Sequence, residues 1–222
     1  SQDVAIMTTL QIQALSPALT KSLTAAQIGA LTTEQVRILS TSQVQALALG
    51  QVQALTSQHI QALSTSQLAA LSAAQVASMT TAQIASLNEL DVPPGPNNFY
   101  KGEPSQVSSL SKAQVAVMTT NQISQLRTEQ LRALSTSQVL ALTGSEVASL
   151  TTQQIGYLRD AQVAALSPSQ IQAIETQDLQ AMTTGAIVAI APQSLASLTT
   201  VQVSALRTDQ LNALTSSQFV KI

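Results

Sequence analysis

The stretch STSQVQAL, residues 40–47, decides the fold, because the chain repeats it with small changes along most of its 222 residues. Leucine, or a methionine or isoleucine in its place, recurs every eight residues, eleven times from Met7 to Leu87 and fifteen times from Leu110 to Ile222. A valine, isoleucine or leucine usually stands three residues before it, and a glutamine usually stands four residues before it. The consensus octad is S/T-x-x-Q-V/I-x-A-L, and a repeat this dominant predicts a repeat architecture.

The octad does not suit one continuous helix. Eight residues at about 100° each advance about 80° beyond two full turns, so the apolar pair would wind around the helix and line no face. A β-solenoid stays open as an alternative, because the glutamine column could form an amide ladder. Against it, side chains three residues apart fall on opposite faces of a strand.

Each octad carries the start signal of its own short helix. Serine or threonine at its first position is a favoured N-cap, and glutamine three residues later completes a capping box. The prolines at positions 17, 168 and 192 fall directly after a cap position, where a helix tolerates proline. We assign capping to Ser40 with Gln43, Ser64 with Gln67, and Ser135 with Gln138. The sequence therefore predicts an all-α fold with one helix of about two turns per octad.

Helices this short are unstable alone, so each must bury its apolar face against neighbouring octads. Residues three apart share a helix face, which places Val44 with Leu47 and Val139 with Leu142 in the core. The predicted result is a solenoid whose stability accumulates repeat by repeat. In the second half, alternate octads always begin with serine or threonine while the others often begin with arginine, which suggests two octads per coil.

Composition narrows the function. Charged residues make up 9% of the chain and aromatic residues 2%, and the net charge is −2. Nucleic-acid binding needs a basic surface, so we expect no nucleic-acid partner. Without cysteine there is no disulfide, thiolate metal site or cysteine nucleophile. No apolar run approaches the roughly 18 residues of a membrane span, so we expect no membrane insertion.

The repeat is interrupted once, by the proline-rich stretch 88–109. We therefore divide the chain into an octad array 1–87, an irregular insertion 88–109 and a second array 110–222. Prolines within the insertion forbid a regular helix, so a projecting loop is expected. It is either a tolerated hinge or a contact loop with Phe99, Tyr100, Lys101 and Glu103 at its tip.

No catalytic or metal-binding constellation is evident, and we expect neither an enzyme nor a cofactor. His59 is the single histidine, and it reads as a polar substitute in the glutamine column. Tyr157 replaces a small residue beside Leu158 and is expected to cover a gap in the core. A sparse row of arginines is expected to be solvated surface; it comprises Arg127, Arg132, Arg159 and Arg207.

Two resemblances add to this interpretation. Octads such as LTTEQVRILSTSQVQALALGQVQAL resemble the short repeats of very large bacterial exoproteins labelled as involved in adhesion or heme utilisation. That resemblance implies an exported, surface-associated repeat protein. The stretches LSPSQIQAI (166–174) and LTTEQVRIL (31–39) are similar to the first helix of TAL-effector repeats, but the Gly-rich base-reading loop and lysines of that family are missing here.

The leading hypothesis is a non-enzymatic structural protein at the cell surface or outside the cell. It would be a rigid spacer or adhesin, or a fibre subunit that associates with itself end to end or side by side. The alternative is a binding module whose 88–105 loop or solenoid face grips a surface protein or glycan. A third reading, ice binding by rows of Ser and Thr, requires hydroxyls that the predicted caps already occupy.

Overall fold

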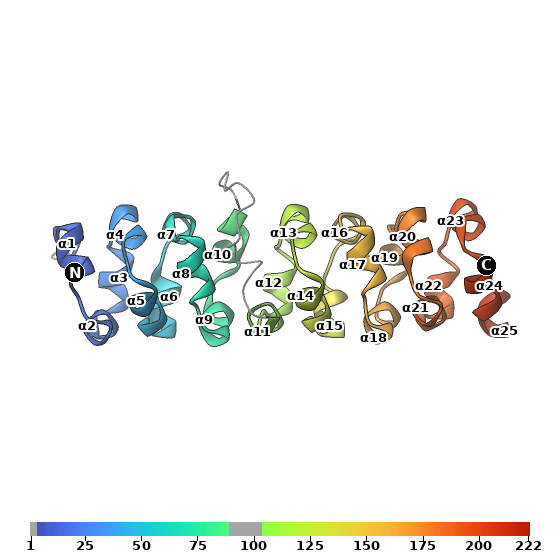
Figure 1. The fold of residues 1–222 in the computed structure, drawn as a ribbon, viewed down its shortest axis with the longest axis horizontal. Helices are drawn as coiled ribbons and strands as arrows, with labels where there is room; N and C mark the ends of the chain where they lie inside the picture. The colour runs from blue at the N-terminus through green and yellow to red at the C-terminus, as the bar shows by residue number, and fades with distance from the viewer. Residues whose placement is uncertain (1–3, 89–103) are drawn as a thin grey trace. The chain divides into compact units, whose positions relative to one another are not determined.

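The computed structural model describes residues 4–88 and 104–222, which form short helices and no strand (Figure 1). The predicted all-α solenoid is confirmed, and the β-solenoid alternative is wrong. The chain forms two compact units, Ser1–Val117 and Met118–Ile222. The predicted division into arrays 1–87 and 110–222 stays a prediction.

Every described α-helix has four to six residues and begins one residue after an octad's first position. The helices of the first unit are α1 (Thr9–Gln13), α2 (Pro17–Ser22), α3 (Ala25–Gly29), α4 (Thr33–Arg37), α5 (Thr41–Ala46), α6 (Leu49–Ala54), α7 (Ser57–Ala62), α8 (Thr65–Ala69), α9 (Ala73–Ser78), α10 (Thr81–Ala85), the 3₁₀ helix η1 (Ser86–Asn88), α11 (Pro104–Ser108) and α12 (Lys112–Val115). Those of the second unit are α13 (Thr120–Ser124), α14 (Thr128–Ala133), α15 (Thr136–Val139), α16 (Gly144–Ala148), α17 (Thr152–Gly156), α18 (Asp160–Ala164), α19 (Pro168–Gln172), α20 (Thr176–Ala181), α21 (Thr184–Ala189), α22 (Pro192–Leu195), α23 (Thr200–Ala205), α24 (Thr208–Ala213) and α25 (Ser216–Phe219).

Local hydrogen bonds start most of the helices, and several of them end at an extended residue. In α5 the backbone N–H of Gln43 donates to the Ser40 hydroxyl at 3.2 Å, and the N–H of Ser40 donates to Gln43 Oε1 at 2.7 Å. Leu47 then takes an extended conformation, with φ −57° and ψ 132°, which turns the chain toward the next cap. The same reciprocal pair of bonds joins Ser64 with Gln67 and Ser135 with Gln138.

Packing between helices shows how many octads make one coil. In the first unit α2 packs on α5, α3 on α6 and α4 on α7; in the second, α17 packs on α20 and α18 on α21. Helices three positions apart are therefore neighbours in successive coils. Hydrogen bonds also reach the helix four positions back, as from Gln43 of α5 to Ile12 of α1. Each coil thus holds between three and four octads.

The prediction of two octads per coil is wrong. One bend per octad turns the chain through only a quarter to a third of a coil, so two bends cannot close it. The alternation of cap residues in the second half has another cause. Arg159 and Arg207 stand at cap positions and donate hydrogen bonds to carbonyls of the preceding coil.

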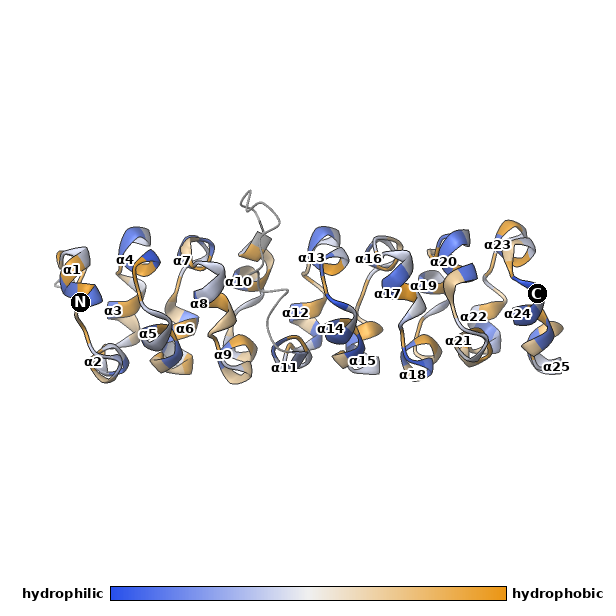
Figure 2. Cartoon of the chain, in the orientation of Figure 1, coloured by the Kyte–Doolittle hydropathy of each residue, from blue (hydrophilic) through white to orange (hydrophobic). Residues whose placement is uncertain are grey.

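The apolar core follows the octad. Val44 and Val139 are almost wholly buried, and Leu47 and Leu142 are 5% and 4% exposed. Figure 2 shows hydrophobic and hydrophilic residues side by side within each short helix. The apolar residues of each octad therefore fill the space between successive coils, where no single helix could bury them alone.

Helix α6 offers a test of the caps, because its N-cap is Ala48 and makes no side-chain bond. Its backbone has φ −70° and ψ 158°, matching Ser40 in α5. We expect Ala48→Ser to raise the free energy of unfolding by about 1 kcal/mol and Ser40→Ala to lower it by about the same amount. Denaturant titration of both variants measures the changes; equal stability of all three proteins would contradict a capping role for the serine.

Candidate functional site: a buried glutamine row

A row of buried glutamines runs through both units, one in most octads. Each has at most 5% of its surface exposed. The members are Gln35, Gln43, Gln51, Gln67, Gln75, Gln83, Gln106, Gln114, Gln122, Gln130, Gln138, Gln154, Gln162, Gln170, Gln202, Gln210 and Gln218. A polar side chain this deeply buried must be hydrogen-bonded, and the row is hereafter called the glutamine row.

Most of these glutamines join their own helix to the preceding coil, although Oε1 of Gln106 has no hydrogen-bond partner among the described residues. Oε1 of Gln162 accepts the N–H of Arg159, the first residue of its octad, at 3.0 Å. The Nε2 of the same side chain donates to the carbonyls of Leu131 and Leu134 at 2.8 and 2.9 Å. Those carbonyls lie 31 and 28 residues earlier, at the fifth and eighth positions of an octad one coil back.

The same geometry recurs in the first unit. Nε2 of Gln75 donates to the carbonyls of Val44 and Leu47 at 3.0 and 2.9 Å, while its Oε1 accepts the N–H of Ser72 at 2.8 Å. A carboxylate could fill the capping half but has no donor for the preceding coil, whereas an amide has both. The site therefore holds successive coils together through hydrogen bonds of uncharged amide groups.

The glutamine row continues across the insertion. Nε2 of Gln106 donates to the carbonyl of Leu71, and Nε2 of Gln114 donates to that of Met79 at 2.7 Å. Both links span 35 residues instead of 28, so the insertion adds seven residues to the coil without breaking the row. The proposed loop tip, Phe99, Tyr100, Lys101 and Glu103, lies outside the described residues.

His59 takes a glutamine's place in α7 and reproduces its capping bond, because Nδ1 accepts the N–H of Thr56 at 3.2 Å. The ring also interacts with the backbone of Leu31, 28 residues earlier. Burial lowers the pKa of His59 below its ordinary 6.5, and the interaction with Leu31 raises it in part. The neutral ring fits the row because an accepting Nδ1 carries no proton.

This geometry predicts an acid sensitivity. A depressed pKa in the folded state means that the unfolded chain binds the proton first as the pH falls, so stability is lost from about pH 7 downward. We expect the free energy of unfolding of the natural protein to fall relative to His59→Gln between about pH 7 and pH 5. Guanidinium titrations of both proteins across that range measure the difference, and parallel pH profiles would contradict the prediction.

Three consecutive octads of the second unit depart from the glutamine row. Asp178, Ala186 and Ser194 hold its positions in α20, α21 and α22. The Ser194 hydroxyl donates to the carbonyl of Leu166 at 3.1 Å. Asp178 is buried, and its Oδ1 has no hydrogen-bond partner. Together these three octads make about one coil, whose attachment to the coil before it lacks the amide donors.

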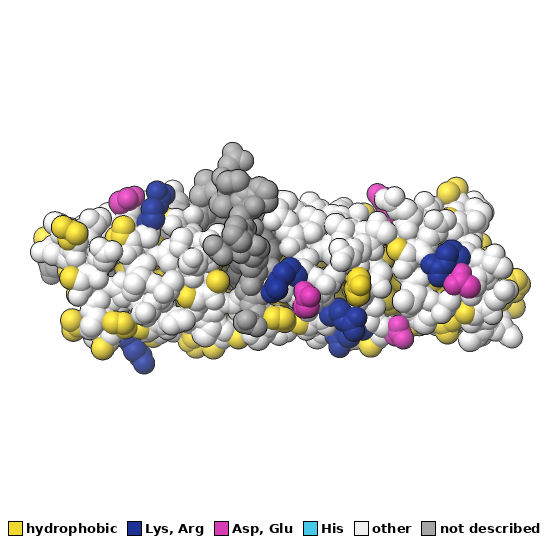
Figure 3. Space-filling view, in the orientation of Figure 1, with side chains coloured by type: hydrophobic (Ala, Val, Ile, Leu, Met, Phe, Trp, Pro, Cys, Tyr) yellow, Lys and Arg dark blue, Asp and Glu magenta, His cyan; other side chains and the backbone are white. Residues whose placement is uncertain are grey.

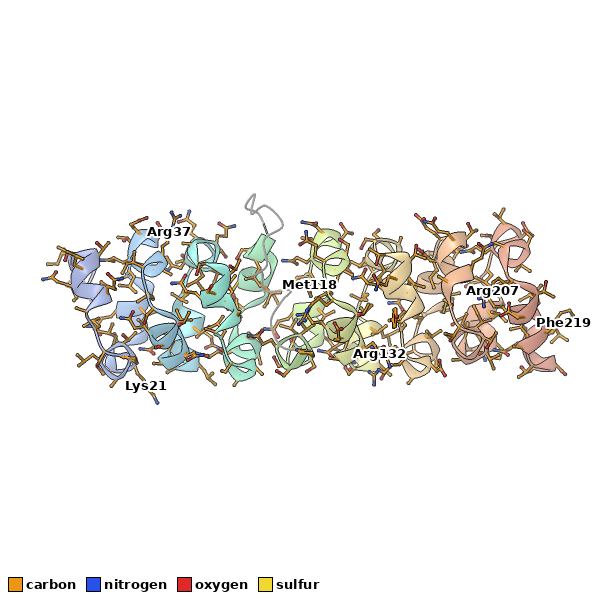
Figure 4. The ribbon with its side chains drawn as sticks, viewed as in Figure 1. Lys21, Arg37, Met118, Arg132, Arg207 and Phe219 are labelled. Atoms are coloured by element: carbon orange, nitrogen blue, oxygen red, sulfur yellow. The ribbon has the colours of Figure 1, made fainter. Side chains whose placement is uncertain are left out.

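Arginines supply further links between coils, and their description as solvated surface is incomplete. Nη2 of Arg159 donates to the carbonyl of Leu134 at 2.8 Å, and Nη1 of Arg207 donates to that of Gln180. Arg207 is also paired with Asp209 at 2.8 Å. Both arginines occupy cap positions that lack a hydroxyl, and both reach helix ends about 25 residues earlier. Figure 4 shows Arg207 and Arg132 on the second unit.

Tyr157 lies away from the core. Tyr157 is 52% exposed, so the prediction that it covers a gap in the core is wrong; as the residue before Leu158 it lies beyond the inward face of α17.

Among the described residues, no three His, Cys, Asp or Glu side chains cluster as a metal site built from side chains alone would require. Within those residues no helix has the length and apolar character of a membrane span.

Sequence reasoning identified the capping half of the glutamine row and missed the half that binds the preceding coil. The signal was present, because a capping box accepts glutamate as readily as glutamine. A column that holds glutamine in most octads and glutamate in only one, at Glu146, indicates that the amide N–H groups are needed as well.

The family described as the ALTTAQ repeat matches residues 26–57 and 52–89 of the chain. These residues run from α3 through η1 and include six members of the glutamine row. The match supports a repeat array and extends no further along the chain. No curated protein matches the chain.

Proposed function

We propose that the chain is a non-enzymatic structural repeat protein that serves as a rigid spacer or adhesin stalk at the cell surface or outside the cell. The observation that carries the proposal is the glutamine row. Its side chains, the most deeply buried polar groups of the octads, are engaged in holding one coil to the next. A chain built this way transmits position and load from coil to coil.

Surface chemistry supports the proposal. The chain has few charged side chains, and Figure 3 shows them scattered singly or in small groups over the visible face. The resemblance to repeats of bacterial exoproteins supports the location. The low charge and the many Ser, Thr and Gln side chains suit a passive connector more than a selective binding surface.

Rigidity is testable within one unit. Because the chain has no cysteine, spin labels can be placed at Thr128→Cys and Thr208→Cys, at the first residues of α14 and α24. A rigid array gives one narrow distance distribution by electron paramagnetic resonance, unchanged by high viscosity. A broad distribution in the folded protein would overturn the spacer.

Location is tested by labelling. In the cells that make the protein, a Thr152→Cys variant is treated with a membrane-impermeant maleimide, with the cysteine-free chain as control. Labelling of intact cells or of secreted protein is expected, because Thr152 is exposed on α17. Labelling only after lysis would reject the extracellular part of the proposal.

A further inference from the structure

We propose that the second unit binds one calcium ion between two of its coils. The ligands are the carboxylates of Asp178 and Glu175, at the start of α20, and the backbone carbonyl oxygens of Val147 and Leu150, one coil earlier. The ion ties α20 to the preceding coil at a place where the glutamine row lacks its amide donor. The site goes beyond the proposed structural role and does not depend on where the protein is located.

The residue at the glutamine position of α20 has the wrong end group for its place. In α19, immediately before it, Nε2 of Gln170 donates at 2.9 and 2.6 Å to the carbonyls 31 and 28 residues earlier. The same spacing places Asp178 opposite the carbonyls of Val147 and Leu150. Val147 lies in α16 and Leu150 between α16 and α17, and α17 packs on α20 (Figure 1). An ionised carboxylate has no proton to donate, so oxygen faces oxygen across this interface.

The cap residue of α20 repeats the substitution. At the cap of α18, Nη2 of Arg159 donates to the carbonyl of Leu134, 25 residues earlier, at 2.8 Å. The buried amide of α18 donates to the same carbonyl at 2.9 Å. Twenty-five residues before Glu175 stands Leu150, whose carbonyl also faces Asp178. Two carboxylates therefore take the places that a guanidinium and an amide hold around the equivalent carbonyl two octads earlier.

The described residues leave these oxygens without a counterpart. Asp178 is 3% exposed, and its Oδ1 has no hydrogen-bond partner. No described side chain donates to the carbonyls of Val147 or Leu150, and no described lysine or arginine forms an ion pair with Asp178 or Glu175. Burying a carboxylate without a partner is costly, and buried charges are paired with an opposite charge or coordinate a metal.

The lengths of the side chains leave room for an ion. In α18 the amide nitrogen stands 2.8 and 2.9 Å from its two carbonyls. Aspartate is shorter than glutamine by one C–C bond, about 1.5 Å. Setting the end group back by that length separates the facing oxygens, and Ca²⁺ can bridge them at a bent angle with oxygen distances of about 2.3–2.6 Å. Glutamate is likewise shorter than the arginine whose place it takes.

The ligand set favours calcium over other common metal ions. All four ligands are oxygens, and Ca²⁺ takes carboxylates, backbone carbonyls and waters in flexible geometry. Mg²⁺ demands a near-ideal octahedron, and Zn²⁺ prefers nitrogen and sulfur ligands. Because the backbone supplies half of the ligands, the site needs no third acidic side chain, and two carboxylates balance the charge of the ion.

The site is open to solvent on one side. Glu175 is exposed, and its Oε2 accepts Nε2 of Gln177 at 2.9 Å, so Oε1 is the oxygen available to the ion. Water can reach the ion past this side chain and complete its coordination. A calcium site with two carboxylates and open access binds weakly, with a Kd of about 10⁻⁴–10⁻³ M, the range of extracellular modules.

Calorimetric titration of the full chain with calcium chloride tests the site. One ion per chain is expected at that affinity, and magnesium chloride should bind at least about 10-fold more weakly. Because the ion binds the folded chain, the midpoint of denaturant unfolding should rise with calcium concentration and fall back when EDTA is added.

Four variants locate the ion. Asp178→Asn and Glu175→Gln each remove one charge from the ligands and should weaken calcium binding at least about 10-fold. Glu129→Gln on α14, two coils before α20, removes an exposed carboxylate and is the matched control, which should bind like the natural chain. Asp178→Gln restores the residue of the glutamine row, so it should resist denaturant in EDTA better than the natural chain and lose its response to calcium. Circular dichroism confirms that each variant folds.

The outcomes are distinguishable. Absence of saturable calcium binding by the natural chain up to about 10 mM, well above the expected Kd, overturns the inference. Unchanged binding by Asp178→Asn also overturns it, as does an equal loss with Glu129→Gln, which would indicate ions gathered by surface charge. A chain that binds no calcium leaves the spacer standing, and a flexible array or intracellular labelling leaves the calcium site standing, so the two proposals fail separately.

Discussion

Replacing Gln162 with leucine is expected to lower the free energy of unfolding of the second unit by about 3 kcal/mol. The substitution puts an apolar side chain of similar size in its place and removes three hydrogen bonds, two to the carbonyls of Leu131 and Leu134 and one from the N–H of Arg159. All of these groups lie at or near buried positions, where an unpaired donor or acceptor costs about 1–3 kcal/mol.

Denaturant unfolding of the natural protein and the variant measures the loss. Gln153→Leu is the matched control, because Gln153 is exposed on α17 and lies outside the glutamine row; it should change stability by less than about 0.5 kcal/mol. Gln162→Glu separates the two halves of the role, since it keeps an acceptor for the cap and removes the donor to the preceding coil. A Gln162→Glu variant as stable as the natural protein would contradict the coupling of coils.

Leu131→Ala is expected to lower the free energy of unfolding by about 3–4 kcal/mol. Leu131 has no exposed surface and sits on α14, whose neighbour one coil later is α17. Truncation leaves a cavity between coils, and the surrounding short helices are fixed by their caps and by the glutamine row, so they cannot close it.

The control is Leu140→Ala, at the half-exposed residue that follows the neighbouring helix α15, and it should cost less than about 0.5 kcal/mol. Thermal and denaturant unfolding of both variants provide the comparison. Equal small losses at the two sites would show that the space between coils is loosely packed, against the burial seen here.

The single helix per octad was predictable because its causes are local. Ser40, Gln43 and Leu47 lie within eight residues, and their bonds close within one octad. The burial of Leu47 follows from the same spacing, since a short helix is stable only when its apolar face packs against neighbouring octads.

The number of octads per coil was not predictable, because it depends on how far the chain bends at residues such as Leu47 and on how neighbouring coils fit. The alternating cap residues suggested two. They mark instead positions such as Arg159, whose guanidinium binds a carbonyl 25 residues earlier, a link that no local pattern reveals. The hydrogen bonds donated by the glutamine row were not predictable for the same reason, because their partners lie 28 and 31 residues away.

The coil formed by α20, α21 and α22 has a consequence under force. A force that separates coils must break amide-to-carbonyl hydrogen bonds at most interfaces. At the interface before α20–α22 the glutamine positions hold Asp178, Ala186 and Ser194, and only Ser194 donates a hydrogen bond to the preceding coil. Tension applied along the second unit would therefore open this interface first, and the remaining coils would hold while it yields.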